Sequence, residues 1–373
     1  MRKILILTNL DVGLYNFRRE VLEALLAVPY EIHIALPAGD FVPKMEEMGC
    51  FFHETKLERR GMNPRNELAL YRRYKEVIAE VKPDIALTYT IKPNVYGGIC
   101  LGKAGVPFIT NITGLGTAVE GDGILQKIMS FLYRKAMKKA GCIFFQNEMN
   151  EKVFTERRIG LGKHKMLPGS GVNTERFSLL PFPGEDEPVS FLYISRVMKE
   201  KGIDQFLEMA EVIKSEYKNT EFHILGFCED DETSPESYRK RIDELERKGI
   251  VSFEGMIEDI RPFLEKSQCT VHPSFYPEGM SNVCLESASS GRCVITTDRP
   301  GCKDTVDDGI SGFIVKQRDS ESLINAVRKF LELPYEERKA MGLRGRQKMV
   351  SHFDRKYVVN AYLEEIEDIL KKK

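Results

Sequence analysis

The chain has 373 residues, of which 42% are hydrophobic and 30% charged, and its formal net charge is −1 at pH 7. This length exceeds what one hydrophobic core usually organises and predicts two domains, while the composition excludes a disordered or membrane-spanning protein and indicates a soluble globular one. No run approaches the roughly 20 apolar residues of a spanning helix, and the strand-like N-terminus has no cleavable signal pattern, so we expect a cytoplasmic protein.

Short apolar runs rich in β-branched residues alternate with segments of helical period through the first half of the chain, with candidate helices at 16–27 and 66–81. In order, the strand-like runs are KILILTN, EIHIALP, CFFHET, DIALTYT, PFITNIT and CIFFQN. The alternation predicts a parallel sheet covered by helices, in an N-terminal domain over 1–178. Because residues 1–186 carry 26 Lys and Arg against 21 Asp and Glu, this half is expected to meet an anionic partner.

The pattern pauses at LLPFPGEDEPV, where prolines, a glycine and acidic residues predict a linker over 179–188. It restarts with the strand-like runs VSFLYIS, EFHILG, VSFEG, CTVHPS and CVITTD. These predict a second domain over 189–352, so the fold class is α/β with two Rossmann-like doubly wound domains. A final helix over 353–373 has apolar residues at helical spacing, which indicates that it packs on a domain.

In a doubly wound sheet, ligands bind beyond the carboxyl ends of the strands, so the loops that follow strands hold the candidate sites. Gly13 follows the first strand and would let the backbone approach a ligand, before a helix expected from about Asn16. A tight strand-to-helix turn would also need a glycine. Arg196 and Lys201 follow the strand at 189–195 and suit a diphosphate, although a solvated run of charges is an equal alternative.

The stretch HPSFYPEGMSNVCLESASSG places Glu278 and Glu286 eight positions apart around Gly279. A helix is expected from about 281 to 290, with Glu278 at the mouth of the crevice and Glu286 about two turns inside. Eight positions amount to a net rotation of about 80°, so both carboxylates are expected to face one side of the crevice. The N–H groups at 279–282 favour an anion, and carboxylates favour sugar hydroxyls. The stretch therefore predicts a nucleotide-sugar site, with a helix-start charge and a surface residue as the alternative.

No feature of the sequence predicts a metal site. The chain contains no D-x-D sequence, and its eight cysteines include no C-x-x-C pair. Most of these cysteines lie in apolar runs, which favours buried reduced thiols over disulfides or metal ligands. We therefore expect the protein to work without a metal or another cofactor.

HPSFYPEGMSNVCLESASSGRCVITTDRPGCKDTVDDGISGFIV, with ISRVMKEKGIDQFLEMA and VSFEGMIEDIRPFLEKSQCTVHPS upstream, resembles glycosyltransferase family 4, whose members are retaining enzymes of the GT-B fold. The segments TNLDVGLYNFRRE, TYTIKPNVYGG, NITGLGT and LPGSGVNTERF resemble the branch that builds surface polysaccharides and lipid-linked oligosaccharides. The resemblance covers nearly the whole chain. It implies an acceptor-binding N-terminal domain, a nucleotide-sugar-binding C-terminal domain, a central cleft between them, and a C-terminal helix that crosses back to the first domain.

The resemblance also implies roles for particular residues. Glu286 would hold the ribose hydroxyls, and Glu278 a hydroxyl of the donor sugar. The other donor-binding residues it implies are Gly13, Arg196, Lys201, Gly279, Met280, Ser281 and Asn282, and the base is expected near Gly255, Met256 and Ile257. In one departure, Thr90, Ile91 and Lys92 occupy the region where several relatives have a histidine that touches the donor sugar, so the donor sugar stays open.

The implied reaction moves a sugar from a nucleotide-sugar donor, expected to be a UDP-sugar, to a lipid-linked or polysaccharide-precursor acceptor. Glu278, Arg196 and Lys201 would be the catalytic residues, and the acceptor hydroxyl would attack on the face from which the diphosphate departs. A nucleotide-sugar epimerase of similar architecture and a non-catalytic scaffold in a polysaccharide assembly complex are the alternatives. A scaffold has no physical need for these glutamates and cations. No nucleic acid partner is expected.

The segment QKIMSFLYRKAMKKAG combines apolar and basic residues at helical spacing. Its apolar residues are Ile128, Phe131, Leu132 and Met137, and its basic residues are Lys127, Arg134, Lys135, Lys138 and Lys139. This pattern is expected of a helix that rests on anionic headgroups at the inner face of the cell membrane and receives a lipid diphosphate sugar. A core helix with a solvated basic face fits equally well.

Overall fold

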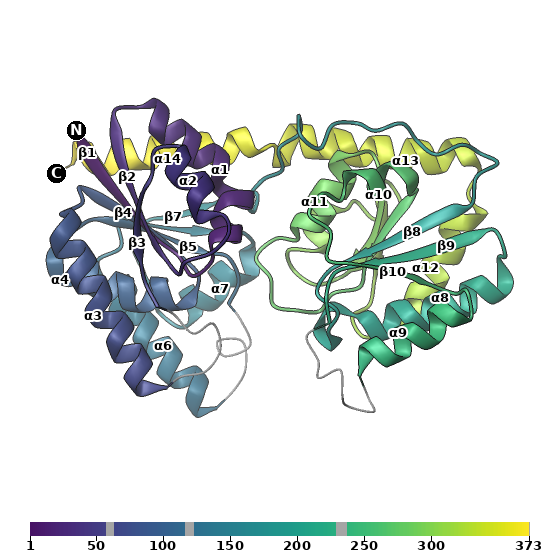
Figure 1. The fold of residues 1–373 in the computed structure, drawn as a ribbon, viewed down its shortest axis with the longest axis horizontal. Helices are drawn as coiled ribbons and strands as arrows, with labels where there is room; N and C mark the ends of the chain where they lie inside the picture. Colours follow the sequence, from purple (N-terminus) through teal and green to yellow (C-terminus); the bar gives the residue numbers. More distant parts are fainter. Residues whose placement is uncertain (57–62, 116–122, 229–236, 373) are drawn as a thin grey trace. The chain divides into compact units, whose positions relative to one another are not determined.

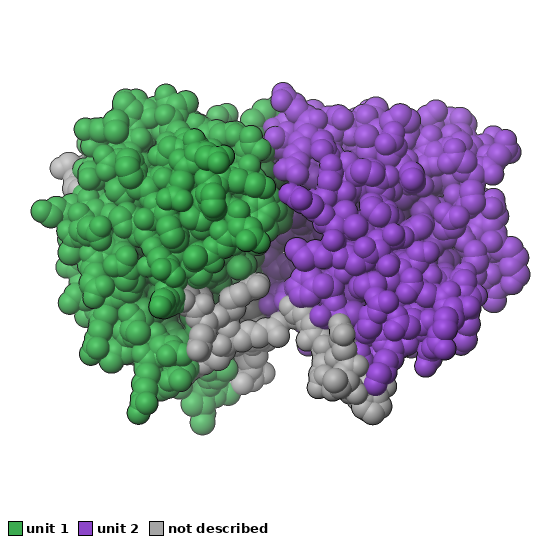
Figure 2. Space-filling view, viewed as in Figure 1, with its two compact units in different colours: residues 1–171, 355–373 green, residues 172–354 purple. Residues whose placement is uncertain are grey.

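The computed structural model describes residues 1–56, 63–115, 123–228 and 237–372. The chain divides into two compact units, coloured separately in Figure 2: unit 1 is Met1–Gly171 with Arg355–Lys373, and unit 2 is Val172–Asp354. Each unit has one parallel β-sheet with α-helices packed against it (Figure 1), which confirms the predicted fold class. The last two residues of the NITGLGT segment lie outside the described residues.

Unit 1 contains a parallel sheet with strand order β3-β2-β1-β4-β5-β6-β7. Its strands are β1 (Arg2–Leu7), β2 (Tyr30–Leu36), β3 (Phe51–Glu54), β4 (Ile85–Tyr89), β5 (Phe108–Ile112), β6 (Cys142–Phe145) and β7 (His164–Met166). Its helices are α1 (Asp11–Ala27), α2 (Val42–Glu47), α3 (Pro64–Val81), α4 (Gly98–Ala104), α6 (Ile124–Met137), α7 (Glu148–Glu156) and α14 (Arg355–Lys371). The strand order reverses between β1 and β4, which makes this the topological switch point of the unit.

Alternating residues of each strand enter different cores, because successive side chains of a strand point to opposite faces of the sheet. In β1, Ile4 and Ile6 pack with residues of α1 and α14, whereas Leu5 and Leu7 pack with residues of α3 and α4. A sheet buried on both faces reads as a continuous apolar run, which is why KILIL predicted a strand so clearly.

Helix α14 belongs to unit 1 although it is the last element of the chain. Val358, Tyr362 and Ile366 are fully buried in the core that also contains α1. At the start of α14, the buried guanidinium of Arg355 donates to the carbonyl oxygens of Asn16 and Gly171, both at 3.1 Å, and to the carboxylate of Glu20 at 2.6 Å. Apolar residues that predicted a packed helix are buried in the core, and Arg355 adds a polar anchor at the start of the helix.

Unit 2 contains a second parallel sheet, with strand order β10-β9-β8-β11-β12-β13. Its strands are β8 (Val189–Ile194), β9 (Thr220–Leu225), β10 (Ser252–Gly255), β11 (Cys269–His272), β12 (Cys293–Thr297) and β13 (Gly312–Val315). Its helices are α8 (Ile203–Glu216), α9 (Tyr238–Arg247), α10 (Arg261–Lys266), α11 (Asn282–Ser289), α12 (Ser320–Glu332) and α13 (Tyr335–Lys348). Here the strand order reverses between β8 and β11.

The segment 179–188, interpreted as a linker from its sequence, belongs to unit 2 in the structure. Its prolines lack N–H donors but keep their carbonyls, and these accept hydrogen bonds: the carbonyl of Pro181 accepts from Arg292 at 2.5 Å and that of Pro183 from the Tyr335 hydroxyl at 2.9 Å. The units therefore divide after Gly171, before the boundary placed at 178, and unit 2 extends to Asp354.

The polar anchor of α14 gives a stability prediction. Arg355→Ala should lower the free energy of unfolding by about 2 kcal/mol, because a buried charged donor with three acceptors is lost. Urea denaturation followed by circular dichroism measures the change. Lys356→Ala, a change at the adjacent exposed residue, is the control and should have little effect. Equal stability of the two variants would show that α14 does not depend on this anchor.

Candidate functional site

Two loops meet at the switch point of unit 2, because β8 and β11 are hydrogen-bonded neighbours. The N–H of Phe275 donates to the carbonyl of Glu200 at 2.9 Å, which joins the loop after β11 to the loop after β8. Gly202 has a φ of +76°, and a Cβ there would lie 2.1 Å from the carbonyl oxygen of Pro273. Only glycine permits this approach, so it holds the two loops in backbone contact.

This contact brings three of the predicted residues together. The ammonium of Lys201 forms an ion pair with the carboxylate of Glu278, and their side chains are 11% and 14% exposed. Lys201 Nζ lies 5.1 Å from the ring centroid of Tyr276, and the guanidinium carbon of Arg196 lies 5.6 Å from the same centroid. Both cations are therefore placed for cation–π contact with one aromatic ring.

Tyr276 was not predicted from the sequence. An aromatic residue two positions before Glu278 was visible, but nothing showed that two cations from another loop would lie against it. The ion pair was missed as well, since Lys201 had been assigned to the diphosphate and Glu278 to a sugar hydroxyl as separate contacts. The positive charge of Lys201 is thus balanced by the carboxylate of Glu278 within the site.

The predicted helix exists, but the geometric argument for its glutamates was wrong. Helix α11 begins at Asn282 with Ser281 as its N-cap, and the Ser281 hydroxyl accepts from the N–H of Cys284 at 3.4 Å. Glu278 lies in the preceding loop, so the rotation of 80° does not apply to it. Glu286 lies in the second turn of the helix and is half-buried.

Two of the predicted donor-binding residues, Ser281 and Met280, make structural contacts within unit 2. The N–H of Ser281 donates to the carbonyl of Gly301 at 2.9 Å, so it is not available to an anion in this structure. The side chain of Met280 is buried in the core that contains α11. Gly279 approaches Gly301 so closely that a Cβ on Gly301 would lie 2.3 Å from the Gly279 carbonyl oxygen. Asn282 is the first residue of α11.

The approach of Gly301 to Gly279 brings a third loop, the one after β12, to the same place. His272, Glu278 and Cys302 each offer a ligand atom, and these atoms all lie within 4.8 Å of one another. Burial, together with the nearby charge of Lys201, lowers the pKa of His272 to about 3, and burial raises the pKa of the Cys302 thiol to about 12. The sequence analysis missed this group because Cys302 is 30 positions from His272 in the sequence and lies in the loop after a different strand.

The predicted base-binding turn follows β10. Gly255 has a φ of +72°, and its carbonyl accepts the N–H of Gly226 at 2.8 Å, which ties the turn to the end of β9. Met256 is 77% exposed, whereas Ile257 packs against a core cluster of unit 2. Met256 is therefore the more exposed of the two side chains, and Ile257 is partly buried.

In unit 1, the expected role of Gly13 as a loop glycine was wrong. Helix α1 begins at Asp11 instead of near Asn16, so Gly13 lies in the first helical turn. A Cβ at Gly13 would make an ordinary contact, 3.5 Å from Cβ of Leu10. At the first residue of the helix, the Asp11 side chain accepts the N–H of Phe41 at 3.0 Å.

The switch point of unit 1 contains polar groups, of which the sequence analysis had noted Thr90 and Lys92 as a departure and had not noted Asn9. Leu7 of β1 pairs with Thr88 of β4, so Asn9 and Thr90 leave neighbouring strands at the same edge. Thr90 has a φ of +69°, which is strained for a β-branched residue. Within the described parts of the chain, neither Asn9 Oδ1 nor Thr90 Oγ1 has a hydrogen-bond partner. Nearby, Lys92 forms an ion pair of 2.6 Å with Glu67.

Helix α6 presents an apolar and basic outer face. Ile128 is 45% and Phe131 60% exposed, and Lys127, Lys135 and Lys138 are exposed beside them. Two further predicted members differ: Met137 is buried in the core, and the ammonium of Lys139 donates to the carbonyl of Gly102 at 2.9 Å. Within the described part of the chain, no helix combines the length and apolarity needed to cross a membrane.

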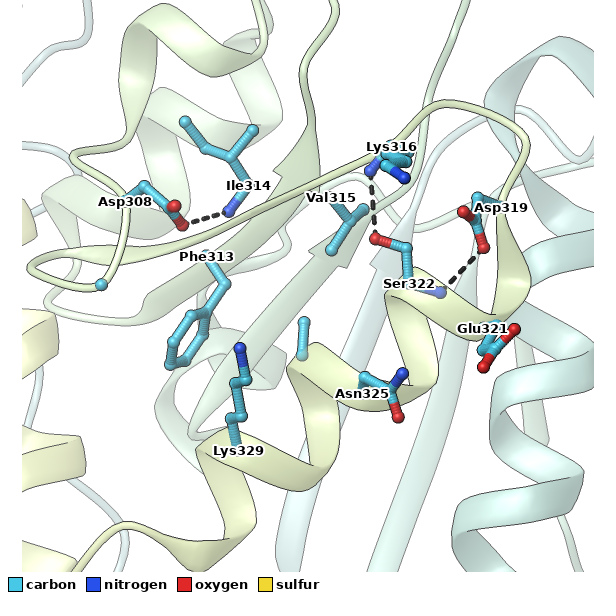
Figure 3. A pocket seen from close by; sticks show the side chains of 12 residues that line it. Asp308, Phe313, Ile314, Val315, Lys316, Asp319, Glu321, Ser322, Asn325 and Lys329 are labelled. Carbon is cyan, nitrogen blue, oxygen red and sulfur yellow. Dashed lines mark hydrogen bonds between the residues drawn. The ribbon is translucent and has the colours of Figure 1, made fainter.

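A pocket of about 540 Å³ lies elsewhere in unit 2, between β13 and α12 (Figure 3). Several of its polar side chains accept hydrogen bonds from backbone N–H groups. Asp308 accepts the N–H of Ile314 at 2.8 Å, the Ser322 hydroxyl accepts the N–H of Lys316 at 3.2 Å, and Asp319 caps α12 through the N–H of Ser322. None of the sequence-predicted site residues lines this pocket. We therefore place the candidate site at the switch point of unit 2.

Two family models match this chain. One, described as "Glycosyl transferase 4-like", matches residues 3–147, and the other, described as "Glycosyl transferases group 1", matches residues 181–348. The chain belongs to glycosyltransferase family 4. These matches confirm the expectation of a glycosyltransferase.

Individual relatives agree. This glycosyltransferase is 24% identical over 344 residues to the N,N'-diacetylbacillosaminyl-diphospho-undecaprenol α-1,3-N-acetylgalactosaminyltransferase of Campylobacter jejuni, with 87% of this chain and 88% of that protein covered. Sucrose-phosphate synthase from Thermosynechococcus elongatus matches with a TM-score of 0.81 at 17% identity, covering 100% of both chains. Anabaena HepE in complex with UDP-glucose matches at 0.78 and 16%, covering 99% of this chain and 100% of that one. These structures establish the GT-B fold.

The ion pair of the glycosyltransferase gives a prediction that does not depend on its substrate. Lys201→Met and Glu278→Gln should each lower the free energy of unfolding by about 1–3 kcal/mol, because each removes one member of an ion pair between two mostly buried side chains. The double variant should lose less than the sum of the two, with a coupling of about 1–2 kcal/mol. Urea denaturation of the four proteins measures it.

The matched control for this cycle is the pair of Lys152 and Glu156 on α7, whose side chains are 68% and 62% exposed. Its coupling should be within experimental error, because solvent screens an exposed pair. Strictly additive effects of the Lys201 and Glu278 changes would show that their ion pair does not form in solution.

Proposed function

We propose that this glycosyltransferase moves a sugar from a UDP-sugar to a lipid-diphosphate-linked acceptor with retention of the anomeric configuration. The observation that carries the proposal is the grouping of Arg196, Lys201 and Glu278 around Tyr276 at the switch point of unit 2. Two cations suit the diphosphate of a nucleotide sugar, and a carboxylate suits sugar hydroxyls. The names of two similar proteins support the substrates, since one acts on a diphospho-undecaprenol sugar and another was solved with UDP-glucose.

The chemistry requires a stabilised leaving group. Departure of UDP concentrates about two negative charges on the diphosphate, and groups positioned in advance must receive them. Arg196 presents a planar fork for two phosphate oxygens, and Lys201 adds a compact charge beside it. The acceptor hydroxyl attacks on the face from which UDP departs, and a phosphate oxygen takes its proton. The protein contributes position and charge, and no protein nucleophile is assigned.

The ion pair does not prevent Lys201 and Glu278 from binding a donor. An ammonium has three N–H donors and a carboxylate has two oxygens, so each group can keep its partner and still contact a ligand. Glu278 would accept from a sugar hydroxyl, and Glu286 would accept from the ribose hydroxyls. The backbone of Gly279 and Asn282 would lie beside the donor, and the turn at 255–257 would lie beside the base.

Unit 1 is proposed to bind the acceptor. Asn9 and Thr90 place polar oxygens at its switch point, the location where doubly wound sheets bind ligands. A sugar hydroxyl would satisfy oxygens that have no partner among the described residues. The strained backbone of Thr90 supports the same interpretation, because such strain concentrates at functional sites.

The experiment that tests the reaction is incubation of the purified protein with UDP-sugars and a polyprenyl-diphosphate-linked sugar, followed by mass spectrometry of the lipid and sugar products. Transfer to the lipid supports the proposal. Release of an epimerised nucleotide sugar, or no turnover with any UDP-sugar, contradicts it. NMR of the new glycosidic linkage determines whether the anomeric configuration is retained.

Stabilisation of the leaving group by side chains gives a sharper prediction. Transfer should persist in excess EDTA, and Arg196→Ala should lower turnover by about tenfold to a thousandfold, as loss of one transition-state donor does. Arg196→Lys should recover only part of the loss, because a point charge cannot reproduce the fork. Arg247→Ala, at an exposed arginine of α9, is the control. Loss of transfer in EDTA that divalent metal restores would contradict the assignment.

Helix α6 is proposed to rest on the inner face of the membrane, where a lipid-linked acceptor is held. Replacing Lys127, Lys135 and Lys138 with Glu should abolish co-sedimentation with liposomes that contain anionic lipid, because each basic residue near such a surface contributes about 1 kcal/mol. Lys139 is left unchanged, since its ammonium binds a backbone carbonyl. UDP binding should not change.

The control for the membrane test carries the same change in net charge at another place. It replaces Lys218, Lys266 and Lys372, which are exposed and lie outside α6, with Glu. This variant should still co-sediment. If both triple variants bind liposomes equally, α6 does not contact the membrane.

A further inference from the structure

Three side chains of different chemistry meet behind the Lys201–Glu278 ion pair. His272 ends β11, Glu278 lies in the loop before α11, and Cys302 lies in the loop after β12. One ligand atom from each lies within 4.8 Å of the other two. His272 and Cys302 are buried, whereas Glu278 reaches the surface, so solvent meets the group on the side of the carboxylate.

The histidine is the unusual member. Its imidazole is 1% exposed, and within the described residues neither ring nitrogen has a hydrogen-bond partner. Buried polar atoms are almost always hydrogen-bonded, because leaving one unsatisfied is costly. His272 Nε2 lies 4.0 Å from a carboxylate oxygen of Glu278, too far for a hydrogen bond. An imidazole nitrogen without a partner, facing a carboxylate and a thiol, is arranged as a metal ligand would be.

The backbone holds the three segments in this arrangement. Gly301 has a φ of +83°, donates its N–H to Asp304 at 2.8 Å and accepts the N–H of Ser281 at 2.9 Å. The Thr296 hydroxyl donates to the carbonyl of His272 at 2.8 Å. Strand β12 is thus joined to the end of β11, and the loop after β12 is joined to the loop before α11, which places Cys302 near His272 and Glu278.

We propose that His272, Glu278 and Cys302 form a binding site for Zn²⁺ or a similar transition-metal ion, and that metal binding inhibits sugar transfer by taking Glu278 from Lys201. Nitrogen, oxygen and sulfur ligands together suit zinc, whereas Mg²⁺ prefers oxygen ligands alone. Zinc bonds of about 2.0–2.3 Å in a tetrahedral site place ligand atoms about 3.3–3.8 Å apart, so modest side-chain movements complete the site. On binding, the Cys302 thiol releases its proton to solvent.

The inhibitory effect rests on the function proposed above. A dication bound to Glu278 repels the ammonium of Lys201, because like charges a few ångströms apart repel strongly in a partly buried site. Lys201 then leaves the position from which it would contact the diphosphate. The carboxylate of Glu278 therefore binds either the metal ion or Lys201.

Metal binding is tested first, without reference to activity. Titration of the reduced full-length protein with Co²⁺ should give the near-ultraviolet absorption of a cobalt–thiolate bond, saturating at one equivalent. Cys302→Ser should abolish this band, and His272→Gln should weaken Co²⁺ and Zn²⁺ binding by about tenfold or more, since even outer-sphere changes at metal sites cost that much. Cys228→Ser, at the half-buried cysteine, should keep the band.

The controls make each outcome decisive. Circular dichroism and the melting temperature check that each variant is folded, and a Cys302→Ala variant replaces Cys302→Ser if the latter unfolds. No thiolate band in the wild-type protein overturns the site, as does a band that survives removal of Cys302.

The second test measures transfer with Zn²⁺ added and then removed by EDTA. Zinc should inhibit the wild-type enzyme reversibly and should inhibit Cys302→Ser at least about tenfold less strongly. Stimulation by zinc, or equal inhibition of both proteins, overturns the inhibitory role. A protein that binds Co²⁺ through Cys302 but transfers no sugar contradicts the proposed function and leaves the metal site standing. A protein that transfers sugar but binds no Co²⁺ supports the proposed function and contradicts the metal site.

Discussion

The ion pair between Lys201 and Glu278 is the interaction on which the candidate site depends. It joins the loops after β8 and β11 at the one place in unit 2 where the strand order reverses. Both side chains are mostly buried, and a buried charge that loses its partner destabilises the folded protein. Tyr276, Arg196 and the His272–Cys302 group are all arranged around this pair. A change to either partner therefore alters several contacts at once.

Backbone-to-backbone contact is what makes the arrangement possible. At Gly202 and Gly301, a Cβ would fall 2.1 Å and 2.3 Å from carbonyl oxygens of the loops opposite, and at Gly226 it would fall 1.8 Å from the carbonyl oxygen of Ser195. All three have positive φ. Each lies in a loop that follows a strand, so the glycines press neighbouring loops together where parallel sheets bind ligands. Because these loops are in contact, short loops are enough to bring the side chains of the candidate site together.

The fold was largely predictable from the sequence, because strands buried on both faces leave continuous apolar runs and amphipathic helices leave a helical period. Arg196, Lys201 and Glu278 were found because they follow such strands. Three features were not. Asp11, at the start of α1, contacts Phe41. Segment 179–188 contacts Arg292 and Tyr335. His272 and Cys302 meet because β11 and β12 are neighbours in the sheet. Each is a contact between distant residues that local pattern does not record.

The charges of the site explain why it contains a carboxylate at all. Arg196 and Lys201 alone would place two positive charges close together, and Glu278 reduces the net charge of the three groups to +1. In the proposed reaction, the departing diphosphate would carry about two negative charges, so the cations would then be opposed by more negative charge than they carry. The negative charge of Glu278 therefore opposes binding of a diphosphate unless the carboxylate gains a hydrogen bond from the ligand. Under the proposed function, a hydroxyl of the donor sugar would supply that contact, and Glu278 would then help to distinguish the donor from the free nucleotide.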